Sequence, residues 1–212
     1  MNGKPEMDLI VLVPGKDESA ALDAMFARSR AIGIRPLRYK IDRHEERDAG
    51  CRLKSPLYLK SAITQFDHAI VMFDREGCGA ERPPRDELEK DLESRLASSG
   101  WGDRAAAIVI DPELENWIWS DSPRVDDALG WKGRDPPLRK WLAAQRMLAE
   151  GQTKPPRPEE ATTAAMKKVM KRRSSDVYAQ IASHVSLMRC ADRVCPFLSG
   201  SENIAKIVGY LA

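Results

Sequence analysis

The stretch HAIVMFDREGCGAE, His68 to Glu81, joins an apolar run to two carboxylates and a glycine-rich loop. The run from His68 to Phe73 is short and almost continuously apolar, which is typical of a strand buried on both faces of a parallel sheet. Asp74 and Glu76 follow at positions i and i+2, so they project to the same side as the strand ends. The stretch therefore predicts a buried strand that carries two acidic side chains to one edge of a sheet.

Apolar runs and amphipathic segments alternate on both sides of this strand. Further strands are expected at residues 7–13, 35–41 and 105–110, and helices at residues 17–33, 55–66 and 83–100. We expect Asp17 or Ser19 to cap the first helix, Gly33 to end it, and Pro56 to lie in the first turn of the second. The pattern predicts an α/β fold with a mainly parallel sheet of about four strands flanked by helices.

The character of the sequence changes after Ile110, where a tryptophan-rich segment, further helical patterns and a proline-rich connector follow. This predicts an α/β core at residues 1–120 and a helical C-terminal region at residues 121–212. Trp117 and Trp119 could stack on a nucleic-acid base, but packing between the two regions is the favoured interpretation.

The chain has 212 residues, 34 basic and 32 acidic side chains, and a formal net charge of +2, so it carries no strong overall field for nucleic acid or membrane. The apolar run near the N-terminus is too short for a bilayer span, and we expect a cytoplasmic protein without membrane contact. Four cysteines without paired spacing and only three histidines disfavour a zinc site or a histidine-based triad. Any chemistry should therefore depend on carboxylates.

Acidic residues follow three of the predicted strands. Glu18 comes after the first, Asp74 and Glu76 after the third, and Glu113 and Glu115 after the fourth, while Asp17 and Asp111 lie beside them. The carboxyl ends of parallel strands share one edge, where oxygen ligands can hold Mg²⁺ or Mn²⁺. A helix N-terminus also favours acidic residues, so each of these acids taken alone has a structural explanation. The prediction of a metal or phosphate site rests on their occurrence together after three strands.

The segments VLVPGKDESAAL and IVMFDREGCGA together resemble the Toprim arrangement of topoisomerases, primases and OLD-type nucleases. The segment VIDPELENWIWS is similar to a segment of small Toprim-like proteins from bacterial defence loci, RloB-like proteins included. The segments SPRVDDALGW and RSSDVYAQIASHVSLMRCADRVCPFLSG resemble the small Toprim-like component of methylation-associated defence systems. The resemblance implies a Toprim-like fold and a role in anti-phage defence beside other subunits of a defence complex.

The resemblance also implies a site for metal-assisted phosphodiester cleavage. Asp74 and Glu76 would hold Mg²⁺, and Glu18 or Glu115 would act as a base or as a ligand of a second metal ion; Glu113 is the weaker candidate. The chain departs from the Toprim pattern at Pro14, which stands where those enzymes carry a catalytic glutamate, and proline cannot transfer a proton.

Residues 151–212 contain ten basic and five acidic side chains, and the cluster KKVMKRRSS supplies half of the basic ones. Basic residues three and four apart on one helix face suit a phosphate backbone. A solvated helix face or a protein-binding surface would have the same composition. The candidate nucleic-acid contacts are Lys154, Lys168, Lys171, Arg172, Arg173 and Ser174.

Two functions of different class are consistent with the sequence. The first is a Mg²⁺-dependent Toprim-like nuclease, or a subunit of one, which cleaves phosphodiester bonds of DNA or RNA. The second is a catalytically degenerate Toprim fold that binds nucleic acid or partner proteins as a sensing or scaffolding subunit. Pro14 favours the second.

Overall fold

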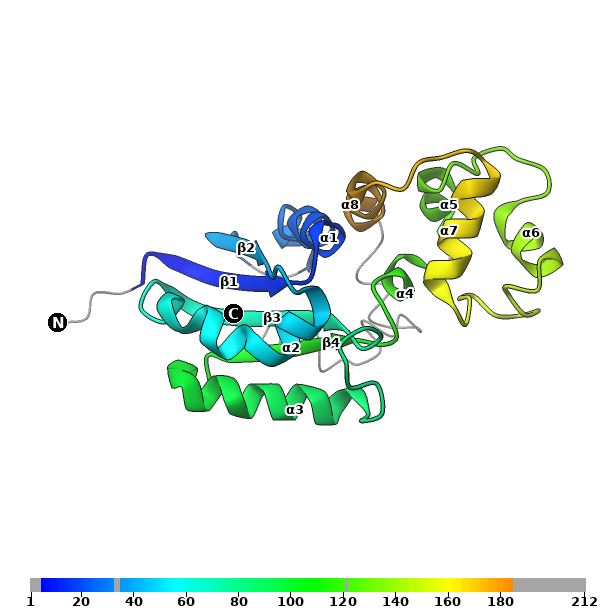
Figure 1. Cartoon of the computed structure of the whole chain (residues 1–212). Helices are drawn as coiled ribbons and strands as arrows, with labels where there is room; N and C mark the ends of the chain where they lie inside the picture. Colours follow the sequence, from blue (N-terminus) through cyan, green and yellow to red (C-terminus); the bar gives the residue numbers. More distant parts are fainter. Residues whose placement is uncertain (1–4, 33–34, 121, 185–212) are drawn as a thin grey trace.

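The computed structural model describes residues 5–32, 35–120 and 122–184, and its centre is a four-stranded parallel sheet (Figure 1). The strand order is β2-β1-β3-β4. Every strand pair is parallel, with Leu9 of β1 beside His68 of β3 and Asp74 of β3 beside Ile110 of β4. The strands are β1 (Met7–Val13), β2 (Tyr39–Arg43), β3 (Phe66–Asp74) and β4 (Ala105–Ile110). The expected α/β fold and the central position of the strand that precedes Asp74 are confirmed.

Two apolar layers cover the two faces of the sheet because side chains alternate along each strand. Ile70 and Met72 of β3 belong to the core beneath α1 (Lys16–Phe26) and α8 (Ser175–His184). Val71 and Phe73 belong to the opposite core, beneath α2 (Arg47–Tyr58) and α3 (Arg85–Leu96). Because the central strands are apolar on both faces, polar groups from them collect at the strand ends.

The remaining helices lie mostly to one side of the sheet, with α5, α6 and α7 gathered around one another in Figure 1. They are α4 (Glu115–Ile118), α5 (Pro123–Ala128), α6 (Leu138–Ala144) and α7 (Pro158–Lys168), and the short turns are η1 (Ser29–Ile32), η2 (Leu59–Ala62) and η3 (Ala97–Trp101). No helix among the described residues has both the length and the apolar character needed to cross a membrane.

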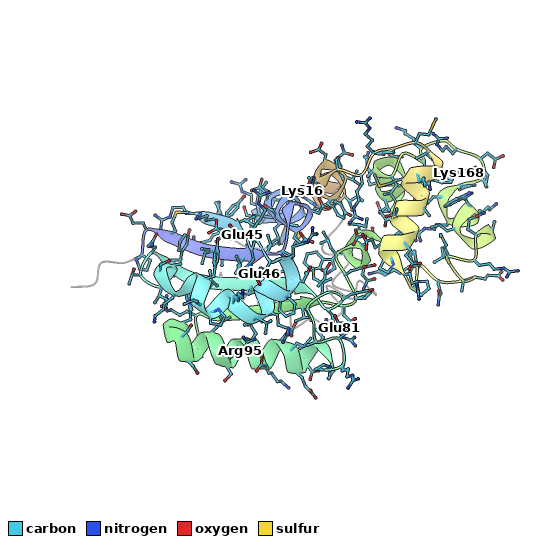
Figure 2. The ribbon with its side chains drawn as sticks, viewed as in Figure 1. Lys16, Glu45, Glu46, Glu81, Arg95 and Lys168 are labelled. Carbon is cyan, nitrogen blue, oxygen red and sulfur yellow. The ribbon has the colours of Figure 1, made fainter. Side chains whose placement is uncertain are left out.

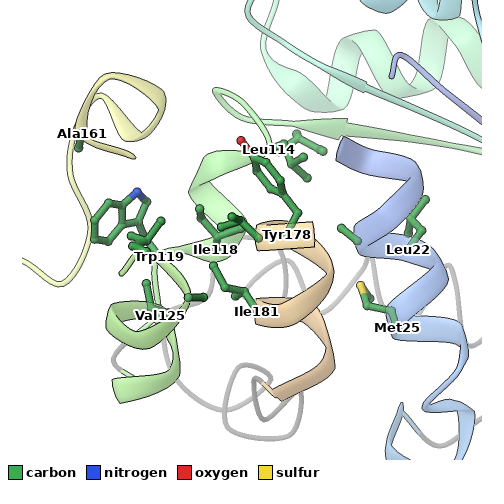
Figure 3. Close-up of a cluster of buried hydrophobic side chains, with 14 of the residues drawn as sticks. Leu22, Met25, Leu114, Ile118, Trp119, Val125, Ala161, Tyr178 and Ile181 are labelled. Atoms are coloured by element: carbon green, nitrogen blue, oxygen red, sulfur yellow. The ribbon is translucent and has the colours of Figure 1, made fainter. Parts of the chain in front are cut away.

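The core above the sheet continues into this helical region without a break. Tyr178 and Ile181 of α8 pack with Ile118 and Val125, and Leu22 of α1 lies on the other side of α8 (Figure 3). Trp119 is fully buried, and its indole Nε1 donates to Thr162 Oγ1 of α7 at 3.0 Å. The interpretation of this tryptophan as packing between the two regions is confirmed.

Three local predictions were wrong. The helix expected at residues 55–66 begins at Arg47 instead, so Pro56 lies inside it rather than in its first turn. The first helix is preceded by Gly15 without a side-chain cap, so neither Asp17 nor Ser19 caps it, and it ends at Phe26. The second strand is displaced toward residues 39–43 because the segment that contains Pro36 precedes the sheet. Gly33 lies outside the described residues.

The strand β4 is the last strand of the sheet, and two glutamates of α3 form hydrogen bonds with backbone N–H groups on its outer side. The backbone N–H of Val109 donates to Glu89 Oε1 at 3.0 Å, and that of Ala107 donates to Glu93 Oε1 at 3.1 Å. A strand at the edge of a sheet offers unpaired N–H groups to other chains, and capping them prevents such pairing. The buried position of Glu89 on α3 is explained by this contact.

We expect Glu89→Ala to destabilise the fold by about 2 kcal/mol, because it removes a charge-assisted hydrogen bond from a buried N–H. It should also increase aggregation on heating. Glu87→Ala, on the exposed side of the same helix, should change the free energy of unfolding by less than about 0.5 kcal/mol. Urea unfolding and light scattering measure both effects, and equal behaviour of the two variants would contradict the capping role.

Candidate functional site

Each strand of the sheet sends one acidic side chain to the same edge. Glu18 follows β1, Asp48 follows β2 in the first turn of α2, Asp74 ends β3, and Glu115 follows β4. We call these four residues the acidic edge. Their charges interact, since Asp48, Glu18 and Glu115 all raise the pKa of Asp74. The parallel topology therefore brings together carboxylates that are widely separated in the sequence.

Glu18 is buried in the first turn of α1, with only 7% of its surface exposed. Burial raises the pKa of its carboxyl group to about 7, and the charges of Asp48, Asp17 and Glu115 act in the same direction. Its Oε2 atom is buried and has no hydrogen-bond partner among the described residues. A Cβ atom at Gly15 would come within 3.0 Å of this oxygen, so the glycine leaves room for the carboxylate.

Asp74 is the last residue of β3, and the charge of Glu18 acts on its carboxyl group. Burial is the main cause that holds the pKa of its carboxyl group well above the usual range, followed by the charges of Asp48 and Glu18. Its backbone N–H donates to Asp48 Oδ1 at 2.9 Å, which ties the start of α2 to the end of the strand. Asp74 Oδ1 is buried without a hydrogen-bond partner in the described part of the chain. Glu18 and Asp74 thus present two uncompensated oxygens.

Glu115 differs from these two because its carboxylate has strong donors. The Tyr178 hydroxyl and Arg173 Nη2 each donate to Glu115 Oε1 at 2.5 Å. Burial nevertheless raises the pKa of Glu115, and the donors only offset part of that effect. Arg173 also reaches Glu159 at 2.5 Å and Asp17 at 3.8 Å.

The structure gives Asp74 and Glu76 different surroundings. Glu76 is exposed, and it lines a hollow of about 320 Å³ together with Pro112, Glu113, Pro156, Arg157, Pro158, Glu159 and Glu160. Glu113 accepts a hydrogen bond from the backbone N–H of Glu159 at 2.7 Å, and burial raises the pKa of its carboxyl group to about 7. Asp111 forms an ion pair with Arg75 at 2.8 Å.

The basic cluster does not form the single helix face that the sequence suggested. The helix α7 ends at Lys168, and residues 169–174 are a turn that leads into α8. Lys171 Nζ donates to the carbonyl of Ala128 at 2.5 Å, and Lys154 Nζ donates to the carbonyl of Asn116 at 2.8 Å.

The candidate nucleic-acid residues therefore differ in how free they are to contact phosphate. Lys168, labelled in Figure 2, and Arg172 are exposed, whereas Arg173 is bound to carboxylates and Ser174 is half-buried. The basic residues of the segment 185–212 lie outside the described residues.

The carboxylate oxygens of the acidic edge are possible ligands for a divalent cation. Among the described residues, no group of three or more His, Cys, Asp or Glu side chains is already gathered to hold a metal ion. Mg²⁺ often keeps several waters and takes only one or two protein carboxylates. The two unpartnered oxygens of Glu18 and Asp74 match that requirement, and a cation would offset the charges that raise the pKa of both groups.

Sequence reasoning missed two members of this site. The sequence did not point to Asp48 because the helix that carries this residue was expected to begin eight residues later. Acidic residues that follow parallel strands share one edge of the sheet, and the same reasoning applied to β2 would have identified Asp48. Tyr178 gave no signal, since its contact with Glu115 joins residues 63 positions apart.

Comparisons of the chain with protein-family models, with curated proteins and with solved structures found no match. The site is therefore interpreted from its own geometry.

The raised pKa of Glu18 predicts a pH-dependent stability. Between the unfolded pKa near 4.5 and the folded pKa near 7, the folded state holds more protons, so stability falls as pH rises through this window. With a metal chelator present, the Glu18→Gln substitution should therefore increase the free energy of unfolding at pH 8 by on the order of 2 kcal/mol. At pH 4 it should have little effect.

Chemical denaturation at the two pH values measures this difference. Glu87→Gln is the control, because Glu87 is exposed on α3. A Glu18→Gln variant that is less stable than the wild type at pH 8 would contradict the uncompensated burial of this carboxylate.

Proposed function

We propose that the protein is a Toprim-like component of a bacterial anti-phage defence system, and that it is a Mg²⁺- or Mn²⁺-dependent nuclease or nuclease subunit. One observation carries the proposal. Four strands of a parallel sheet deliver four carboxylates to one edge, and two of these keep a buried oxygen that has no partner among residues 5–32, 35–120 and 122–184. Such an arrangement is unfavourable for the isolated protein, which supports a cationic ligand.

Glu18 and Asp74 would hold the cation through their unpartnered oxygens. When bound, the cation would neutralise phosphate charge and lower the pKa of water. Asp48 fixes the backbone of Asp74, and Tyr178 orients Glu115, so both ends of the acidic edge are held by hydrogen bonds. Glu76 is exposed and lines a hollow to which neither Glu18 nor Asp74 contributes. We therefore place Glu76 on the path by which a substrate would reach the cation, and not among the ligands of the cation.

Protons are part of this proposal. Burial raises the pKa of Glu18 to about 7 and that of Asp74 well above its usual range, so both groups keep their protons to a higher pH than an ordinary carboxyl group does. A cation that binds to them must displace those protons, so binding should become tighter as pH rises. Pro14 contributes no proton transfer, which leaves Glu18 and Glu115 as the candidates for acid or base at this edge.

A nucleic acid is the proposed substrate, and other subunits of a defence complex are the proposed partners. The exposed cations Lys168 and Arg172 lie at the end of α7 and in the turn that leads to Arg173, and Arg173 contacts the acidic edge. A phosphate backbone held by these two side chains would pass near the turn that reaches the carboxylates.

The second candidate function is a scaffolding or sensing subunit without turnover. Two observations favour it, namely Pro14 and the ion pairs by which Arg173 already neutralises part of the acidic charge. The two candidates differ in whether a cation binds to Glu18 and Asp74.

A divalent cation should stabilise the wild-type fold. At a hundredfold excess over its dissociation constant, Mn²⁺ should add about 2.7 kcal/mol if the unfolded chain does not bind it. Asp74→Asn should lose most of this gain and any cleavage of single-stranded or duplex nucleic acid. Thermal unfolding and gel assays with labelled oligonucleotides measure the two effects.

Asp103→Asn is the matched control, since Asp103 is exposed just before β4, at the opposite edge of the sheet. It should respond to Mn²⁺ as the wild type does. Mn²⁺ binding without cleavage would favour the scaffolding function, and a wild-type protein indifferent to millimolar Mn²⁺ and Mg²⁺ would overturn the metal site.

The exposed cations can be tested separately. Lys168→Gln with Arg172→Gln should weaken binding to any nucleic-acid sequence and lower the salt dependence by up to about two units of slope, because each neutralised phosphate contributes close to one. Fluorescence anisotropy at several salt concentrations measures the slope. Unchanged affinity and slope would assign this surface to a protein partner or to solvent.

A further inference from the structure

The acidic residues at the edge of the sheet fall into two groups with different partners. Glu18 and Asp74 each keep a buried oxygen without a partner among the described residues. Glu115 and Asp17, by contrast, are bound by Arg173. Charge is therefore compensated on one side of the edge and left open on the other.

Arg173 reaches this position from the turn between α7 and α8. Its guanidinium contacts Glu115 and Glu159 at 2.5 Å each and Asp17 at 3.8 Å, and it lies 5.8 Å from the centre of the Tyr178 ring. These carboxylates come from three different elements, α1, α4 and α7. One cation thus joins acids from separate parts of the chain, as a metal ion does.

The turn that carries Arg173 is itself fixed to the acidic edge. Ser175, two residues after Arg173, donates from its Oγ to Asp17 Oδ1 at 2.7 Å, and the Tyr178 hydroxyl donates to Glu115. The helix α8 packs against α1, which carries Asp17 and Glu18 (Figure 1). The guanidinium is therefore held in place rather than free in solvent.

We propose that Arg173 stands in for a second divalent cation at the acidic edge, so that its guanidinium occupies Glu115 and Asp17 and confines metal binding to Glu18 and Asp74. This inference rests on the proposed function for the open position, and it assigns Arg173 a positioning role there. It predicts that one chain binds one divalent cation and that removing the guanidinium creates a second position.

A guanidinium suits this role because its planar fork can donate to several carboxylates at once and it stays charged at every accessible pH. Unlike a metal ion, it cannot be removed by a chelator. The result is a site that depends on a single exchangeable cation.

The test counts Mn²⁺ ions bound per chain in the wild type, Arg173→Gln and Arg172→Gln. Arg172 is the exposed neighbour, so its variant removes the same charge away from the carboxylates. Isothermal titration calorimetry gives the stoichiometry, and electron paramagnetic resonance detects coupling between two Mn²⁺ ions in one site. Circular dichroism confirms that each variant is folded.

We expect one Mn²⁺ in the wild type and in Arg172→Gln, and two coupled ions in Arg173→Gln. If Arg173→Gln does not fold, Arg173→Lys replaces it. The lysine keeps a positive charge near Glu115 but lacks the fork, so it should admit the second ion at a higher Mn²⁺ concentration.

The outcomes separate this inference from the proposed function. One ion in the wild type and one in the folded Arg173 variant would overturn the stand-in role and leave the metal site intact. No ion in the wild type and one in the variant would support the stand-in role while contradicting a metal-dependent nuclease. No ion in either protein would overturn both.

Discussion

The structure depends on one electrostatic constraint, which is the repulsion between acidic side chains at one edge of the sheet. It arises because the carboxyl ends of all strands of a parallel sheet lie at the same edge. Here each strand brings an acid to that edge, and burial removes the water that would otherwise solvate the charges. Glu18 and Asp74 respond with a raised pKa, whereas Glu115 is bound by Tyr178 and Arg173. The surrounding elements therefore carry side chains that offset part of this accumulated negative charge.

The helical region is part of that arrangement rather than an independent appendage. Trp119 and Ile118 join the core above the sheet to α7 and α8, and α8 returns to pack on α1. That return brings Arg173 and Tyr178 to carboxylates that the sheet alone would leave exposed to one another. Packing energy from the apolar contacts thus supports a polar site that would otherwise destabilise the fold.

Three strands, β1, β3 and β4, could be predicted from sequence because they are short apolar runs with clear ends, whereas β2 begins four residues later than expected. Glu18, Asp74 and Glu115 could be predicted because acidic residues that follow parallel strands share one edge of the sheet. The start of α2 could not, since its first turn is charged and contains no capping motif, and Asp48 was lost with it. The partners of Arg173 were also beyond reach. A run of basic residues predicts a solvent-facing or phosphate-binding surface, and only the tertiary fold reveals that one of them is already paired with a buried acid, Glu115.

The central claim is that Glu18 and Asp74 each keep one buried carboxyl oxygen without a hydrogen-bond partner in the described part of the chain, and that a divalent cation would bind to these oxygens. The most direct measurement is carbon-13 NMR of the side-chain carboxyl carbons as a function of pH, with Glu18→Gln and Asp74→Asn for assignment. Without metal, we expect Glu18 to titrate near pH 7 and Asp74 far above its usual range. With saturating Mg²⁺, both resonances should remain in the ionised position down to a lower pH. Ordinary carboxyl pKa values that Mg²⁺ does not change would contradict the account.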